Sequence, residues 1–108
     1  MKVYQYIIIL LFWLLNVPVL NAQESEEDLN KKALELFEQK EFEQAFKIYS
    51  TLLSIEMQSP EYNFRFGACQ LFTAQDKEEP LKYLKFAVDN ASAPALAHFY
   101  YGLGLHLN

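Results

Sequence analysis

The chain has 108 residues, of which 52% are hydrophobic, and a formal net charge of −5 at pH 7. This length allows about one small domain. The acidic balance argues against nucleic acid as a partner, because nucleic-acid binders gain much of their affinity from clustered Lys and Arg that neutralise phosphates. Cys69 is the only cysteine, which excludes an internal disulfide, and its small neighbours Gly67 and Ala68 favour a buried thiol packed against another helix.

The first 22 residues have the pattern of a secretory signal peptide. Lys2 precedes an unbroken apolar run, YIIILLFWLL, which Asn16 and Pro18 then interrupt, and Ala22 is a suitable residue before a cleavage point. A membrane-spanning helix needs about 20 consecutive apolar residues, so a retained anchor is the less favoured alternative. We therefore expect residues 1–22 to be removed, residues 23–108 to form the mature chain, and the protein to be exported to the periplasm or outer membrane.

The next segment, from about residue 25 to residue 58, predicts a pair of helices. Ser25 can cap the first helix, whose apolar positions recur at helical spacing up to Phe37. Polar residues 39–41 mark a turn without glycine. A second helix follows from Phe42, and its small residue Ala45 would let the two helices approach closely.

Three more helices are predicted in the remainder of the chain. Ser59 and Pro60 are typical of a cap followed by a first helical residue. Asp76 is the expected cap of a fourth helix that continues to about Val88, with Pro80 in its first turn. Residues 95–107 predict a fifth helix that is apolar nearly all round, and because such a helix lacks a covering partner we expect the chain to be the front part of a longer protein.

Small residues repeat at a period of about 34 residues. Ala33, Gly67 and Gly102 are spaced by 34 and 35 residues, and Ala45 and Pro80 are 35 residues apart. A period of this size built from helix pairs is the signature of the tetratricopeptide repeat. The sequence therefore predicts an all-α fold, a right-handed superhelical stack of antiparallel helix pairs with about two and a half repeats. The residues expected to let the helices nest are Ala33, Ala45, Gly67, Ala87 and Gly102.

With Tyr49 added to these small residues, the chain resembles the tetratricopeptide repeat family over essentially everything after the leader. More narrowly, the order of a leader ending in NAQ, an acidic start, NFRFGACQLF and FYYGLGLHLN is similar to the N-terminal region of bacterial exported envelope proteins of the OmpA-like family. In those proteins the repeats precede a propeller-like domain and a peptidoglycan-binding domain. The resemblance implies a scaffold at the outer membrane, with peptidoglycan bound only through domains that are not in this chain.

The same resemblance implies that the first helix of each pair lines a concave groove. The groove positions carried over from the family are Asn30, Leu34, Phe37, Phe64, Ala68, Leu71, Phe99 and Leu103. These positions are largely apolar, which favours a hydrophobic or extended-peptide surface over a clamp for carboxylates. The alternative for each residue is that it belongs to the core between helices.

Residue patterns that would indicate catalysis, a metal or a cofactor are weak. His98 and His106 lie eight residues apart without further ligands at suitable spacing. The acidic pairs at residues 26–27 and 78–79 lie at helix starts, where they complement the helix dipole. The serines lack a nucleophile-elbow context. We therefore expect no enzyme activity, no metal and no cofactor.

The function predicted from the sequence is a non-catalytic protein–protein interaction module of an exported cell-envelope scaffold. Its expected partners are other envelope proteins or peptides, with self-association through the last helix as a further expectation. The alternatives are a self-contained soluble adaptor and a subunit that positions a separate enzyme.

Overall fold

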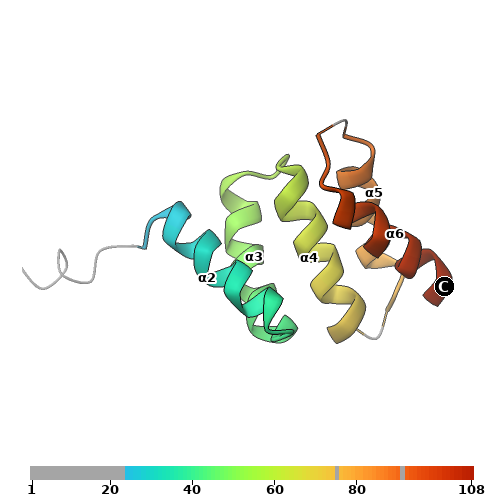
Figure 1. Cartoon of the computed structure of the whole chain (residues 1–108), viewed down its shortest axis with the longest axis horizontal. Helices are drawn as coiled ribbons and strands as arrows, with labels where there is room; N and C mark the ends of the chain where they lie inside the picture. The colour runs from blue at the N-terminus through green and yellow to red at the C-terminus, as the bar shows by residue number, and fades with distance from the viewer. Residues whose placement is uncertain (1–23, 75, 91) are drawn as a thin grey trace, which may run out of the picture.

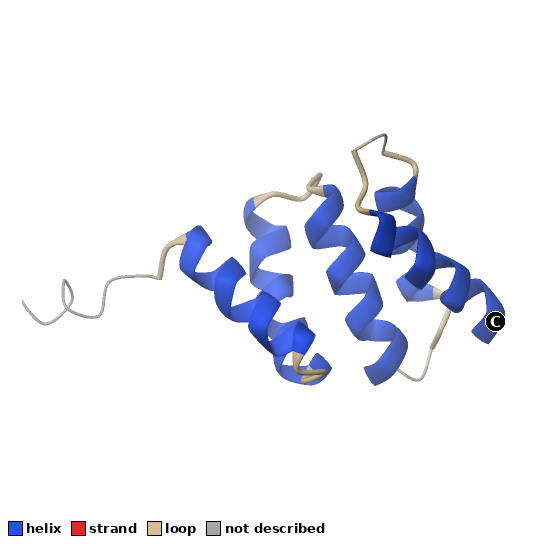
Figure 2. Cartoon of the chain, viewed as in Figure 1, coloured by secondary structure: helices blue, strands red, loops and turns tan. Residues whose placement is uncertain are grey.

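The computed structural model describes residues 24–74, 76–90 and 92–108, so the predicted signal peptide at residues 1–22 lies outside the described residues. The described chain forms five helices, which are α2 (Glu26–Glu38), α3 (Phe42–Ile55), α4 (Pro60–Thr73), α5 (Glu79–Val88) and α6 (Ala95–Leu107). Each helix packs on the one before it and runs back along it, and α4 also contacts α6 (Figure 1). The predicted all-α class is confirmed, because helices and loops alone make up the described residues (Figure 2). None of these helices combines the length and the apolar character that crossing a membrane requires.

Two of the helix starts follow the capping signals in the sequence. The side chain of Ser25 accepts a hydrogen bond from the amide of Asp28 at 3.1 Å, and Ser59 accepts one from the amide of Tyr62 at 3.2 Å. Pro60 follows as the first residue of α4, where its missing N–H costs nothing. The turn between α2 and α3 contains Lys40 with a φ of 63°, a left-handed conformation that closes the turn without a glycine.

The predicted cap of α5 is wrong. The helix begins at Glu79 with Glu78 as its N-cap residue, and Asp76 lies two residues earlier, where its carboxylate accepts a hydrogen bond from the amide of Glu78 at 2.9 Å. Asp76 therefore forms a local turn ahead of the helix. Lys77 lies in the same segment and donates to the carbonyl oxygens of Leu71 and Ala74, which satisfies backbone groups at the end of α4.

The core is centred on α4. Nine of its fourteen residues are buried, and among them Phe64, Ala68 and Cys69 are fully shielded from solvent. The neighbouring helices contribute Tyr49 and Leu52 from α3 and further residues from the other helices. A helix that is apolar or buried on most sides lies in the interior of a fold. α4 is accordingly the central helix of the described chain.

The buried positions of α2, α4 and α6 follow the same spacing along the chain. On α2 the buried residues are Ala33 and Phe37, and 34 residues later α4 buries Gly67 and Leu71. On α6 the buried residues are Ala97 and Gly104, and 35 residues earlier α4 buries Tyr62 and Cys69. Thus α2 buries the face that corresponds to Gly67 and Leu71 of α4, and α6 buries the face that corresponds to Tyr62 and Cys69 of α4. Only α4 buries both faces.

Candidate protein-interaction surface

Four of the predicted groove residues lie in the core. Phe37, Phe64, Ala68 and Leu71 are between 0% and 5% exposed, so each belongs to the core between helices, which is the alternative to a groove position that the sequence left open. The reason is that other helices cover α4 on two sides. Positions that would face an open groove in a single helix pair therefore contact neighbouring helices here. Asn30, Leu34 and Leu103 are half-buried, and Phe99 is the one predicted groove residue that is largely exposed, at 62%.

The small residues predicted to let helices nest behave differently from one another. Ala33, Ala45 and Ala87 are fully buried. A Cβ added at Gly67 would lie 2.9 Å from Cγ of Leu84 and 3.0 Å from the carbonyl oxygen of Pro80, so glycine is needed for α5 to pack this closely.

The predicted packing role of Gly102 is wrong for the helices of the described structure. A Cβ at Gly102 would meet no atom within 4 Å, whereas one at Gly104 would lie 2.8 Å from Cδ2 of Leu81 and 3.3 Å from Cδ2 of Leu71. Gly104, which the sequence analysis did not single out, is thus the glycine that lets α6 approach the preceding helix pair. Its spacing of seven residues from Ala97, two helical turns on the same side, is the signal that would have identified it.

Aromatic rings link α2, α4 and α6. The ring centroid of Phe37 in α2 lies 6.1 Å from that of Phe64 in α4 and 5.8 Å from that of Tyr100 in α6. The guanidinium of Arg65 lies 5.0 Å and 4.8 Å from the ring centroids of Phe37 and Phe64, close enough for cation–π attraction, and its Nε donates to Glu61 at 3.3 Å. Only 13% of the Arg65 side chain is exposed. This basic group therefore contributes to cohesion between helices.

The outward face of α6 is the largest departure from an ordinary water-facing helix. Four of its large hydrophobic side chains are between 45% and 62% exposed, and they are Leu96, Phe99, Leu105 and Leu107. No Asp, Glu, Lys or Arg occurs in the helix. We call Phe99, Gly102 and His106, which follow one another at spacings of three and four residues and are all exposed, the Gly102 face.

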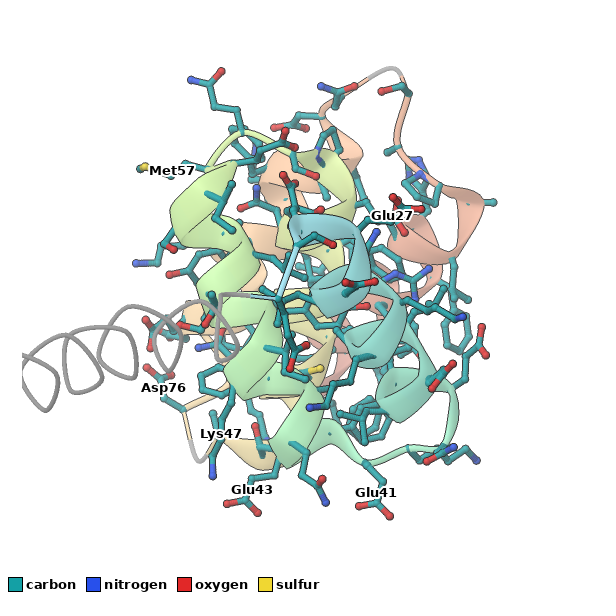
Figure 3. The ribbon with its side chains drawn as sticks, turned by 90° about the vertical axis from the view of Figure 1, so that its left-hand side faces the viewer. Glu27, Glu41, Glu43, Lys47, Met57 and Asp76 are labelled. Atoms are coloured by element: carbon teal, nitrogen blue, oxygen red, sulfur yellow. The ribbon has the colours of Figure 1, made fainter. Side chains whose placement is uncertain are left out.

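The opposite end of the described chain is charged. On α2 the exposed residues include Asp28, Lys32 and Glu35. Figure 3, which views the molecule from this end, shows Glu41 and Glu43 projecting away from the packed helices. An apolar patch marks an interaction site when it stands out against polar surroundings. The contrast singles out α6 as the candidate interaction surface.

The chemistry of the remaining groups is that of a packed core. Burial raises the pKa of the Cys69 thiol to about 12, which disfavours the thiolate that a nucleophile or metal ligand requires. Burial likewise raises the pKa of Tyr49 well above its usual value. In residues 24–74, 76–90 and 92–108, no three His, Cys, Asp or Glu side chains gather in a way that could hold a metal ion.

A hollow between α3 and α4 contains one unpaired polar atom. It is lined by Glu43, Phe46, Lys47, Gln70 and Phe72 together with Thr73 and Ala74. Gln70 is 6% exposed, and its Oε1 has no hydrogen-bond partner among the described residues.

Comparison with known proteins identifies no relative of this chain. No protein-family model matches it, no curated protein matches it, and no solved structure matches it. The interpretation of its function therefore rests on its own residues and packing.

Proposed function

We propose that this chain is a non-catalytic protein–protein interaction module built as a stack of tetratricopeptide-type helix pairs. The repeated burial of small residues on α2 and α4 supports the stack. The observation that carries the interaction role is the outward face of α6, where Phe99 and Leu105 are more than half exposed and no charged side chain accompanies them. Solvent-exposed apolar surface of this kind is stabilised when a partner covers it.

We also propose that the module acts outside the cytoplasm, as part of a cell-envelope scaffold. Support comes from residues 1–22, whose short apolar run and Ala22 fit a cleaved signal peptide. The acidic balance of the chain fits protein partners better than nucleic acid. Fusion of the full chain to a reporter that is active only after export should give a signal that depends on residues 1–22. An unchanged signal after their deletion would contradict the export proposal.

The interaction role can be tested by site-specific photo-crosslinking. A photoreactive residue at Phe99 in the full chain, produced in cells, should give discrete adducts with a small number of proteins. The matched control places the same residue at Glu35, an exposed position on α2, where no such adducts are expected. Equal labelling from the two positions, or none from position 99, would contradict α6 as the interaction surface.

A further inference from the structure

Gln70 places an unpaired amide in the hollow between α3 and α4, which we call the Gln70 hollow. Only 6% of this residue is exposed, and its Oε1 has no hydrogen-bond partner among the described residues. A buried acceptor without a donor destabilises the state that contains it. The last torsion of a glutamine side chain is broad and nearly two-fold, so the amide can turn and present Oε1 to the hollow. The Gln70 hollow therefore suits a ligand that donates a hydrogen bond.

The walls of the Gln70 hollow are aromatic and its rim is charged. Phe46 and Phe72 line it, and Phe72 is 48% exposed. Glu43 and Lys47 line it as well, both exposed and four residues apart on α3. Apolar walls with a few polar groups are typical of ligand sites. Because the two charges at the rim are opposite in sign, the hollow favours a ligand without a large net charge.

A second hollow, which we call the Asn63 hollow, is also lined by α3 and α4 and reaches α5 at Tyr83. Asn63 is 5% exposed, and its Nδ2 donates to the carbonyl oxygens of Met57 at 3.0 Å and Ser59 at 2.8 Å. Both N–H groups of the amide are thus used, which fixes its orientation and leaves Oδ1 as its acceptor. The residues that line this hollow are Ser50, Leu53, Ser54, Met57, Asn63, Phe66 and Tyr83.

The two hollows lie along one side of α4, and together we call them the α4 trough. Asn63, Phe66 and Gln70 follow one another at spacings of three and four residues, which places them on one helix face. The ring centroids of Phe46, from the Gln70 hollow, and Phe66, from the Asn63 hollow, are 4.8 Å apart. The two amides are separated by about 10 Å of helix, which about three extended residues would span. A ligand that reaches both amides is therefore chain-like.

The size of the hollows and the helices around them also favour a ligand. Their volumes of about 540 and 340 Å³ lie in the usual range for ligand pockets, roughly 300 to 1,000 Å³. The trough stays open although α3, α5 and α6 all pack against α4. It lies between helices that follow one another inside the described chain, at a distance along the sequence from its last helix.

We propose that the α4 trough binds an extended peptide segment of a partner protein. Main-chain N–H groups of the peptide donate to Gln70 and Asn63, and an apolar side chain of the peptide packs on the stacked rings of Phe46 and Phe66. An extended peptide fits because its main chain carries a neutral donor at every residue except proline and its side chains alternate in direction. This inference goes beyond the proposed function, because it assigns a second binding surface, separate from α6, and the kind of ligand that it takes.

The trough can be probed with random peptides of about seven residues, which span about 20 Å when extended. The peptides are displayed on phage and selected against the full chain, and the dissociation constants of labelled copies are measured by fluorescence polarisation. Gln70→Met keeps the length of the side chain and removes the amide, so it should weaken binding about tenfold. The matched control is Gln44→Met, at an exposed position of α3 that lines neither hollow, and it should leave the affinity unchanged.

Two further measurements separate binding from folding. Ser50→Trp places a large side chain at the Asn63 hollow and should abolish binding, whereas Thr51→Trp, at the next exposed residue of α3, should not. Gln70→Met should leave the thermal midpoint unchanged or higher, because methionine needs no hydrogen-bond donor. A lower midpoint together with unchanged affinity would assign the Gln70 amide to the fold alone and overturn its role in binding.

The remaining outcomes are equally decisive. A selection that yields no binding peptide, or peptides that bind Gln70→Met and Ser50→Trp as tightly as the parent chain, would overturn the α4 trough as a peptide site. Dimers of the chain that dissociate in Ser50→Trp would identify a second copy as the occupant and overturn the proposed partner. The proposed function fails separately, because Leu105→Glu on α6 should leave the peptide affinity unchanged, and crosslinking from position 99 reports on α6 alone.

Discussion

The two outermost helices of the described chain, α2 and α6, are each thirteen residues long and each bury only two residues. Their exposed residues nevertheless differ in kind. On α2 most are charged, beginning with Glu27 and Asp28 in the first turn. On α6 they are hydrophobic or small apart from His98 and His106, and the helix holds no Asp, Glu, Lys or Arg.

This difference shows that burial alone does not decide the role of a helix. A stack of helix pairs needs a polar outer face where it ends, because an uncovered apolar face lowers solubility. α2 has such a polar outer face, whereas α6 lacks Asp, Glu, Lys and Arg altogether. The outer side of α2 therefore exposes charged side chains, whereas the outer side of α6 exposes apolar ones.

The largest expected effect compares two phenylalanines 35 residues apart. Phe64 on α4 is 0% exposed and Phe99 on α6 is 62% exposed. Phe64→Ala should lower the free energy of unfolding by about 3 to 5 kcal/mol, because it removes a large core side chain and leaves a cavity. Phe99→Ala should cost less than about 1 kcal/mol. Urea denaturation of both variants measures the difference, and equal losses would mean that α6 is already covered in the purified protein.

A smaller effect separates Gly67 from Gly102. Gly67→Ala should lower the free energy of unfolding by about 1 to 2 kcal/mol, because overpacking against Leu84 outweighs the better helix propensity of alanine. Gly102→Ala should raise it by about 0.5 to 1 kcal/mol, since only the propensity gain remains where space is open. Thermal unfolding of the two variants should give shifts of opposite sign. A loss of stability in Gly102→Ala would show that this position is already packed.

Local signals explain which parts of the fold the sequence predicts. A capping serine, a proline at a first helical position and apolar residues at helical spacing act within one or two turns, so the starts at Ser25 and Ser59 and the extent of α6 could be read directly. The start of α5 was harder, because Asp76, Glu78 and Glu79 all offer a carboxylate near the helix start and packing of the chain selects among them.

The residues of the interaction surface could not be predicted from any one helix alone. Phe64 and Ala68 have the residue types of either a groove or a core, and only the helices on both sides of α4 decide between the two. Gly102 and Gly104 are equally plausible packing residues by composition. The period of the repeat selects Gly102, whereas contact with the preceding pair selects Gly104, so the role of each glycine depends on where α4 and α5 lie relative to α6.

The stability of the first turn of α2, at the charged end of the molecule, can be lowered by removing its N-cap. Ser25→Ala removes the acceptor for the amide of Asp28 and should cost about 1 kcal/mol, as is usual for an N-cap serine. Because α2 lies at the edge of the described stack, we expect the loss to appear as faster amide hydrogen exchange at the start of α2, with little change in α6. Ser50→Ala on the exposed side of α3 is the control and should leave exchange in α2 unchanged. Faster exchange in every helix of Ser25→Ala would instead make α2 part of the central cooperative unit.

The smallest effect on the free energy of unfolding is expected for Leu105→Glu, which places a charge on the apolar outer side of α6. Leu105 is 52% exposed, so Leu105→Glu should change the free energy of unfolding by less than about 0.5 kcal/mol. The charge interrupts the apolar surface of α6, so we expect less fluorescence from a dye that binds exposed hydrophobic surface. Glu35→Leu on α2 is the reverse substitution at an exposed position and should increase the dye signal. If Leu105→Glu lost several kcal/mol while the dye signal stayed the same, the outer side of α6 would be part of the core and the two ends of the molecule would not differ as described.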